Sequence, residues 1–181
     1  MQSLTWYVHR LGRMSIPELC YRALQMGRIH ATRLARIRAV PEPHPARPIS
    51  FIDIDARVEV ALYIARAERI MEGCFDIFDL ENVQLGHPPV WNRDPLTGRI
   101  APLRHASTID YRDERVVGNI KYLWEPSRHL HVPALAQAYA LTKDARYAEA
   151  MRLHIESWIE QCPPHMGAHW TSSLELAIRL I

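Results

Sequence analysis

Apolar residues along the chain recur mainly at helical spacing, and strand-like alternation is scarce. The clearest helix is predicted over residues 145–161, with Asp144 as its cap, because its core-facing side chains fall on one stripe. That stripe comprises Tyr147, Met151, His154, Ile155 and Trp158. Further helices are predicted over residues 4–13, 15–38, 57–72, 133–142 and from 172 to the end. The pattern predicts an all-α fold of helix hairpins stacked side by side.

Three segments break this helical pattern. Residues 74–86 alternate apolar and polar positions and predict a short strand pair, and residues 88–102 form a turn-rich loop. The segment PEPHPARP, residues 41–48, has four prolines in eight positions and predicts a stiff extended linker. We therefore divide the chain into a helical leader with its linker, residues 1–48, and a helical domain, residues 49–181.

The final helix has a start signal but no stop signal. Ser172 and Glu175 have capping-box spacing, and the pattern is still helical at Ile181. Either this helix caps the molecule or the chain is the front portion of a longer protein, and the second interpretation is favoured.

Composition narrows the class of protein. An apolar content of 48% and a charged content of 23% are ordinary for a soluble globular domain. A chain of this length should bury roughly 70% of its unfolded surface. No apolar run approaches a membrane span, and arginines 10 and 13 interrupt the place where a signal peptide needs its apolar stretch. We expect no stable membrane insertion, and the compartment stays open: cytoplasmic by default, with a periplasmic or secreted location as the alternative.

Cofactor and metal motifs are absent from the sequence. The three cysteines are far apart and form no CxxC pair, which argues against a disulfide framework and a zinc site. His129 and His131 lie two positions apart and cannot share a helix face, so they are not predicted as metal ligands. No HExxH, GxGxxG, P-loop or GxSxG motif occurs. We expect no cofactor and no metal.

Charge is distributed unevenly behind a net value of +2. Residues 1–40 carry seven arginines against one acid, Glu18, a balance of +6, and the remainder of the chain is acidic. Two interpretations stay open: a solvated arginine-rich helix face, or an arm that meets a membrane surface, a nucleic acid or an acidic polymer. Nucleic acid is not our predicted partner.

Two polar clusters carry the candidate chemistry. GNIKYLWEPSRHLH, residues 118–131, crowds charged side chains around Trp124, which a helix that only buries a face would not need. GAHWTSSLELAIR, residues 167–179, places His169 in a tight turn before a helix N-terminus, whose free amides favour anions.

These clusters also carry a resemblance. WNRDPLTG, VGNIKYLWEPSRHLHVPALAQAYALTKDARYAEA and SWIEQCPPHMGAHWTSSLELAIRLI resemble the N-terminal helical domain of the heparinase II/III-like polysaccharide lyases, from about Trp91 to Ile181. Residues 1–56 resemble more loosely the leaders of family members encoded with exopolysaccharide genes. The resemblance implies an incomplete (α/α) toroid followed by a β-sandwich, with an acidic polysaccharide in the cleft between them.

The implied reaction is β-elimination at a uronic acid residue, with an acidic polysaccharide as partner. His169 stands where the family commonly has asparagine and sometimes histidine, and it would neutralise the uronate carboxylate. The alternative is a loop histidine that caps a neighbouring carbonyl. The tyrosine base and a second histidine lie beyond residue 181 in the family's order, so the chain alone is expected to catalyse nothing. The oligomeric state is left open.

The implied substrate-binding residues have structural alternatives. The candidates are Asn119, Lys121, Trp124, Glu125, Arg128, Trp170, Glu175 and Arg179. Either Trp124 stacks on a sugar while Arg128 or Lys121 pairs with sugar acids, or Glu125 and Arg128 are an i,i+3 pair beside a core tryptophan. Glu175 and Arg179 are expected to form an i,i+4 salt bridge that orients the last helix. A non-catalytic carbohydrate-binding or scaffolding protein of polysaccharide assembly is the alternative function.

Overall fold

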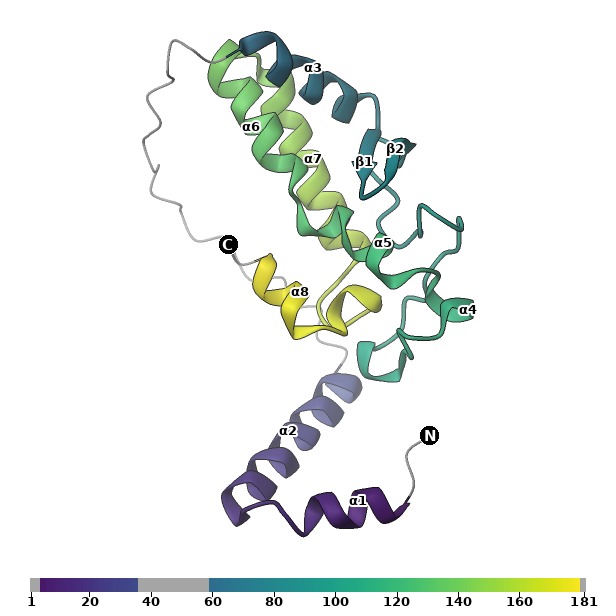
Figure 1. The fold of residues 1–181 in the computed structure, drawn as a ribbon. Coiled ribbons are helices and arrows are strands. Elements are labelled where there is room, and N and C mark those ends of the chain that lie inside the picture. Colours follow the sequence, from purple (N-terminus) through teal and green to yellow (C-terminus); the bar gives the residue numbers. More distant parts are fainter. Residues whose placement is uncertain (1–3, 36–58, 180–181) are drawn as a thin grey trace. The chain divides into compact units, whose positions relative to one another are not determined.

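The computed structural model describes residues 4–35 and 59–179, and the chain divides into two compact units, residues 1–37 and 38–181 (Figure 1). The first unit contains α1 (Leu4–Leu11) and α2 (Ile16–Ala35). The amide of Glu18 donates to Ser15 Oγ over 3.4 Å, and this hydrogen bond caps the start of α2. The predicted linker at 41–48 lies outside the described residues.

The second unit is mostly helical, and its described part contains one two-stranded sheet. Its longer elements are α3 (Val60–Met71), β1 (Cys74–Ile77), β2 (Leu80–Gln84), α6 (His131–Thr142) and α7 (Ala145–Gln161). Its short helices are α4 (Glu114–Val117), α5 (Ile120–Trp124) and α8 (Ser173–Ile178), and its 3₁₀ turns are η1 (Ala106–Thr108), η2 (Pro126–Arg128) and η3 (Ala168–Trp170). The predicted mainly helical class is confirmed. In the described part of the chain, no helix has the length and apolarity needed to cross a membrane.

The main core lies where α3 packs against the hairpin of α6 and α7, which run side by side (Figure 1). Asp144 Oδ1 accepts from the amide of Arg146 at the start of α7, so the predicted cap is confirmed. Tyr147 is buried on the predicted stripe, and its hydroxyl donates to Glu68 Oε1 on α3 over 2.6 Å. That bond raises the pKa of Tyr147 to about 12. The core members are Ala67, Ile70, Phe75, Ile77, Ala134, Leu135, Ala138, Tyr147 and Ala150.

The predicted strand pair is confirmed as an antiparallel hairpin. Phe75 pairs with Val83, and the alternation places Phe75 and Ile77 in the core while Asp76 faces outward. Arg69 on α3 binds Asp76 through both carboxylate oxygens, at 2.6 and 3.0 Å, so the hairpin is tied to the helix before it.

The loop before the polar clusters is anchored by a buried carboxylate. Asp94 is completely buried, and it accepts hydrogen bonds from the amides of Leu96 and Asn119 at 3.0 and 2.9 Å. Gly118 has a φ of 73°, and a Cβ there would lie 2.7 Å from Asp94 Cβ. The close approach of this backbone to Asp94 therefore requires glycine at 118.

Replacing Gly118 should test that requirement against a matched position. Gly98 has a similar φ of 72°, but a Cβ there would meet only Arg93, at 3.8 Å. Gly98→Ala should cost about 1 kcal/mol of backbone strain, whereas Gly118→Ala adds a clash and should cost roughly 2–4 kcal/mol. Urea unfolding measures the free energy of unfolding of both variants. Equal losses of stability would show that the contact with Asp94 does not require glycine at 118.

Candidate functional site

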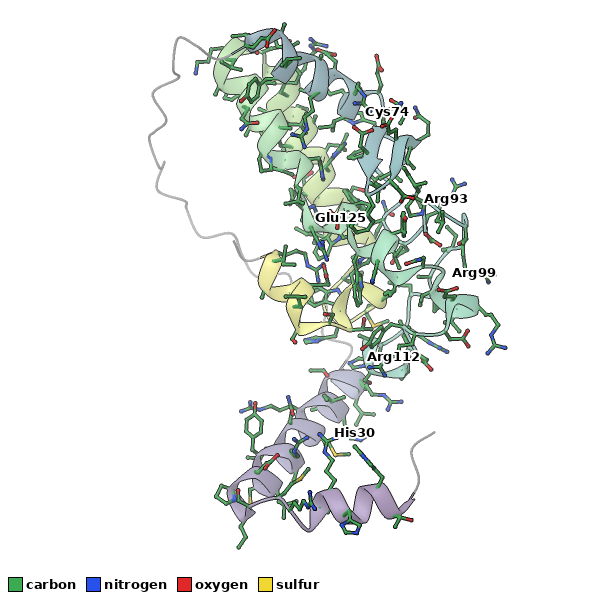
Figure 2. All side chains as sticks on the ribbon, viewed as in Figure 1. His30, Cys74, Arg93, Arg99, Arg112 and Glu125 are labelled. Atoms are coloured by element: carbon green, nitrogen blue, oxygen red, sulfur yellow. The ribbon has the colours of Figure 1, made fainter. Side chains whose placement is uncertain are left out.

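The two polar clusters, 47 positions apart at their main contact, meet in the structure. Trp124 at the end of α5 donates its indole N–H to the carbonyl of Ala168, over 3.0 Å. Arg128 in η2 reaches Glu175 in α8. Figure 2 labels Glu125, the residue between α5 and η2, near the lower end of α6.

Arg128 is the centre of this contact. Its Nε and Nη2 donate to the two oxygens of Glu175 at 2.9 and 2.7 Å, and its Nη1 donates to Glu125 Oε2 at 2.6 Å. Glu175 is 1% exposed, so its carboxylate depends on this guanidinium for compensation. Of the two alternatives for this stretch, the structure shows the Glu125–Arg128 i,i+3 pair. The predicted Glu175–Arg179 salt bridge is wrong, because Glu175 turns instead to the guanidinium of η2.

Arg179 binds the turn that contains His169 and not Glu175. Its Nη2 donates to the carbonyl of His169 over 2.5 Å, and its guanidinium lies 5.2 Å from the ring centre of Trp158. Partial burial lowers the pKa of Arg179 from its ordinary value. The residue therefore fixes the turn that holds His169 from the inside.

His169 is completely buried. Its Nε2 lies 2.9 Å from the carbonyl oxygen of Trp91, and since a carbonyl can only accept, Nε2 carries the hydrogen. Its Nδ1 is buried and has no hydrogen-bond partner among the described residues. Burial lowers the pKa of His169 to about 3, so the ring is neutral at pH 7. The predicted catalytic role of His169 stays a prediction, and the ring must give up the Trp91 carbonyl before it can reach a sugar.

The other predicted residues differ in how accessible they are. Of the nine predicted site residues, Lys121 alone is classed as exposed. Asn119 caps α5 through its Oδ1 and the amide of Lys121, and Trp170 donates its indole N–H to the carbonyl of Cys162. Trp124 is half-buried beside Tyr111. Most of the polar groups proposed for substrate therefore already bind protein.

A cluster of aromatic and imidazole rings around Trp91 was not predicted. His131 stacks on Trp91 with ring centres 5.8 Å apart and lies 5.1 Å from His154, whose Nε2 is 2.8 Å from His87 Nδ1. Burial lowers the pKa of His129 and of His154 to about 4, and that of His131 well below its ordinary value. The described residues contain no group of three or more side chains arranged to hold a metal. The position of His154 on the core stripe was the available sequence signal.

A comparison with protein-family models agrees with the resemblance found in the sequence. Residues 96–181 match the model described as "Heparinase II/III N-terminus". This match supports a relationship between these residues and the heparinase II/III-like family. Searches of curated proteins and of solved structures found no match. The heparinase II/III-like segment includes both polar clusters, and the family connects the chain with polysaccharide lyases.

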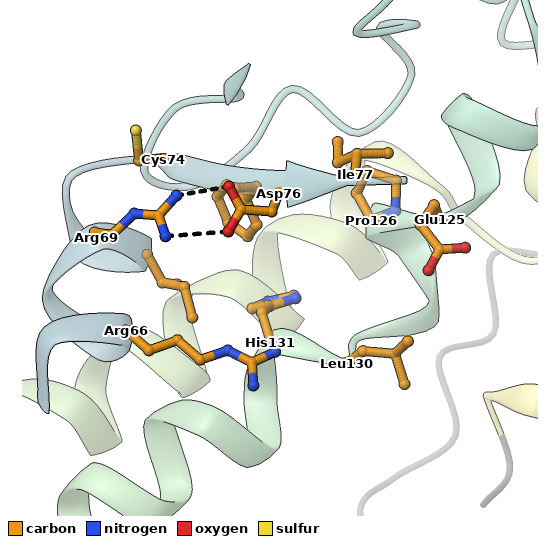
Figure 3. A pocket seen from close by; sticks show the side chains of 11 residues that line it. Arg66, Arg69, Cys74, Asp76, Ile77, Glu125, Pro126, Leu130 and His131 are labelled. Atoms are coloured by element: carbon orange, nitrogen blue, oxygen red, sulfur yellow. Dashed lines mark hydrogen bonds and ion pairs between the residues drawn. The ribbon is translucent and has the colours of Figure 1, made fainter. Parts of the chain in front are cut away.

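The described part of the second unit also contains a pocket (Figure 3). This pocket extends outside residues 96–181, the heparinase II/III-like segment. Its volume is about 210 Å³, and it lies between α3, β1 and the turn that leads into α6. Residues 125–131 supply one wall from within the segment, and residues 66–77 supply the other before it begins. Arg66, Arg69 and Asp76 on that second wall were not predicted, because they look like ordinary surface positions of a helix and a strand.

Removing Arg128 should destabilise the fold, because it leaves the buried Glu175 carboxylate unpaired. Arg128→Ala is expected to lower the free energy of unfolding by roughly 3–5 kcal/mol, because Glu175 stays buried without a counter-charge. Arg152→Ala is the matched control: this arginine also binds two glutamates, Glu149 and Glu156, but all three are exposed, so about 1 kcal/mol or less is expected. Urea unfolding of both variants would contradict the assignment if their losses were equal.

Stability should fall as the solution is acidified below neutrality. Histidine titrates near 6.5 when unfolded, but the folded pKa is about 4 for His129 and His154 and about 3 for His169. Between pH 6.5 and 4 these histidines are therefore protonated in the unfolded chain but stay neutral in the folded chain. Stability is fully present above pH 6.5 and falls by up to ~1.4 kcal/mol per pH unit for each such histidine.

Urea unfolding between pH 7.5 and 5 measures this slope. His154→Phe should reduce the slope, whereas His165→Asn, at an exposed histidine with positive φ, should leave it unchanged. A slope that His154→Phe does not alter would contradict the buried neutral state of this ring.

Proposed function

We propose that this chain is the N-terminal helical part of a polysaccharide lyase that cleaves a uronate-containing polysaccharide by β-elimination. The family match over residues 96–181 supports the lyase relationship. The observation that carries the proposal is the bidentate contact of Arg128 with Glu175, because it brings the two motif segments into one assembly. The helices α3, α6 and α7 would then be the first part of an (α/α) toroid, followed by a β-sandwich.

The chemistry explains why such a site needs donors. A base removes the proton from C5 of the uronate, the electron pair forms the C4–C5 double bond, and the 4-O-glycosidic bond breaks with protonation of the leaving oxygen. The carbanion-like state beside a carboxylate needs hydrogen-bond donors fixed in advance. Positioned acid–base groups add roughly 10²–10⁴-fold. The tyrosine base and the second histidine are expected beyond residue 181, so this chain alone is proposed to be inactive.

Lys121 and His169 have different places in the proposal. Lys121 is exposed and would pair with a sugar acid at the surface of the first polar cluster, residues 118–131. His169 would steady the reacting carboxylate as a neutral N–H donor, since its pKa of about 3 excludes a charged ring at pH 7. This step demands that the ring exchange its bond to the Trp91 carbonyl for one to the substrate. Asn119, Trp124 and Trp170 would support the groove.

Absorbance of the unsaturated product in a panel of uronate polymers tests the reaction, with the complete protein that contains this chain. His169→Ala should lower the rate by about 100-fold or more, because one aimed donor is lost. His169→Asn keeps an N–H and should restore part of the rate. No product from any polymer would retire the lyase proposal. Equal rates for wild type and His169→Ala, with both shown to be folded, would remove His169 from the mechanism.

Burial of His169 favours a second candidate, a non-catalytic carbohydrate-binding or scaffolding protein of polysaccharide assembly. Such a protein needs surface contacts but no proton transfer. Binding and product formation, measured together, distinguish the two candidates. The second candidate predicts that the complete protein binds the polymer but forms no unsaturated product.

A further inference from the structure

The pocket between α3 and the turn before α6 has the size of a single-ring site. Its volume of about 210 Å³ lies below the roughly 300–1,000 Å³ typical of sites for drug-sized ligands. Figure 3 shows charged side chains entering it from α3 and β1, and Glu125, Pro126 and Leu130 on the other wall. A pocket with apolar walls and a few placed polar groups has the composition of a small-ligand site.

Most of the charge in this pocket is already balanced. Arg69 binds Asp76 through two hydrogen bonds and also donates to Asn82 Oδ1 over 2.9 Å, so its guanidinium and the Asp76 carboxylate form a satisfied unit. Glu125 Oε2 accepts a hydrogen bond from Arg128 Nη1, and Glu125 Oε1 accepts no hydrogen bond from the described residues. One acceptor in the pocket is therefore still available.

Arg66 is the uncommitted cation. Within the described part of the chain its guanidinium makes no hydrogen bond and no ion pair, although it lines the pocket and its charge acts on Asp76. Figure 3 shows its side chain extending from α3 below His131 in that view. An arginine presents parallel N–H donors that match the two oxygens of a carboxylate.

The remaining walls are apolar or uncharged. His131 is 7% exposed and lies edge-on to Phe75 with ring centres 5.4 Å apart. Because burial keeps the imidazole neutral at pH 7, His131 adds no second positive charge beside Arg66. Pro126 and Leu130 offer apolar surface, and Leu130 is 56% exposed. The pocket thus combines one free cation, one free acceptor and a partly open apolar wall.

We propose that this pocket binds one uronate residue of an acidic polysaccharide, with the sugar carboxylate on Arg66, a hydroxyl on Glu125 Oε1 and the apolar side of the ring on Leu130. The inference rests on the proposed function for the class of substrate. It extends that function to a site whose cation lies before the heparinase II/III-like segment, outside residues 96–181. The pocket contributes affinity and position, and takes no part in bond breaking.

Titration of the isotope-labelled 181-residue chain with three probes tests the proposal, using chemical shifts of Leu130 and Phe75 as the readout. The probes are glucuronate, glucose and acetate, which separate the acidic sugar from the ring alone and from the carboxylate alone. Glucuronate should bind tightest. Arg66→Gln should weaken it by at least ~10-fold, because a charge-assisted pair is lost, and should leave glucose unchanged.

Lys143→Gln is the matched control. It removes one positive charge at the other end of α6, about 18 Å along the helix from His131, and should leave glucuronate affinity unchanged. Leu130→Glu places a competing carboxylate in the pocket that Arg66 lines and should also weaken glucuronate binding. Thermal unfolding of each variant confirms that it is folded.

Three results would overturn the proposal: unchanged glucuronate affinity in Arg66→Gln, glucose binding as tightly as glucuronate, or acetate binding as tightly as glucuronate, which would define a simple anion site. The product assay reports on the lyase proposal separately. Binding without product leaves the pocket standing and removes the lyase, whereas product without binding removes the pocket and leaves the lyase.

Discussion

The buried carboxylate of Glu175 and its guanidinium partner are the constraint on which the candidate site depends. A carboxylate at 1% exposure is stable only beside a fixed opposite charge, and Arg128 supplies it with two hydrogen bonds. This pair holds α8 against η2. Once α8 is held, Arg179 can bind the carbonyl of His169, and Trp124 can close on the neighbouring Ala168 carbonyl. The turn that contains His169 is therefore held at two carbonyls, by side chains from the two polar clusters.

The same constraint changes how those clusters are interpreted chemically. A guanidinium that binds two glutamates has little left for a sugar acid, and an indole N–H bonded to a carbonyl is not a free donor. The polar residues around Trp124 thus first satisfy one another's hydrogen bonds. They do so in the junction, the place where α5 and η2 meet η3 and α8. Available charge lies at the edges: Lys121 is exposed on α5, and Arg66 is uncommitted within the described part of α3. The proposed recognition of a substrate is therefore better sought at Lys121 and Arg66 than among these paired side chains.

Local signals predicted the mainly helical class and the strand pair, and long-range partners account for what was missed. The cap at Asp144, the stripe that buries Tyr147 and the alternation of the hairpin depend on neighbours within a few positions, so the sequence pattern contains them. The choice of Arg128 rather than Arg179 as partner of Glu175 depends on a contact across 47 positions, which spacing on one helix cannot reveal. The burial of His169 was missed for the same reason, because the Trp91 carbonyl that receives its N–H lies 78 positions away. The pocket combines α3 with a turn near residue 130, and no single motif contains both.

Glu125 links the junction to the pocket. One of its oxygens is held by Arg128, and the residue also lines the pocket that contains Arg66. Because Arg128 is itself fixed by the buried Glu175, the Glu125 carboxylate cannot swing freely, and the pocket wall is set before any ligand arrives. A ligand that meets a wall already in place loses less free energy to ordering side chains. An ion pair that looks purely structural can therefore contribute to recognition, by keeping the free oxygen of Glu125 in one position.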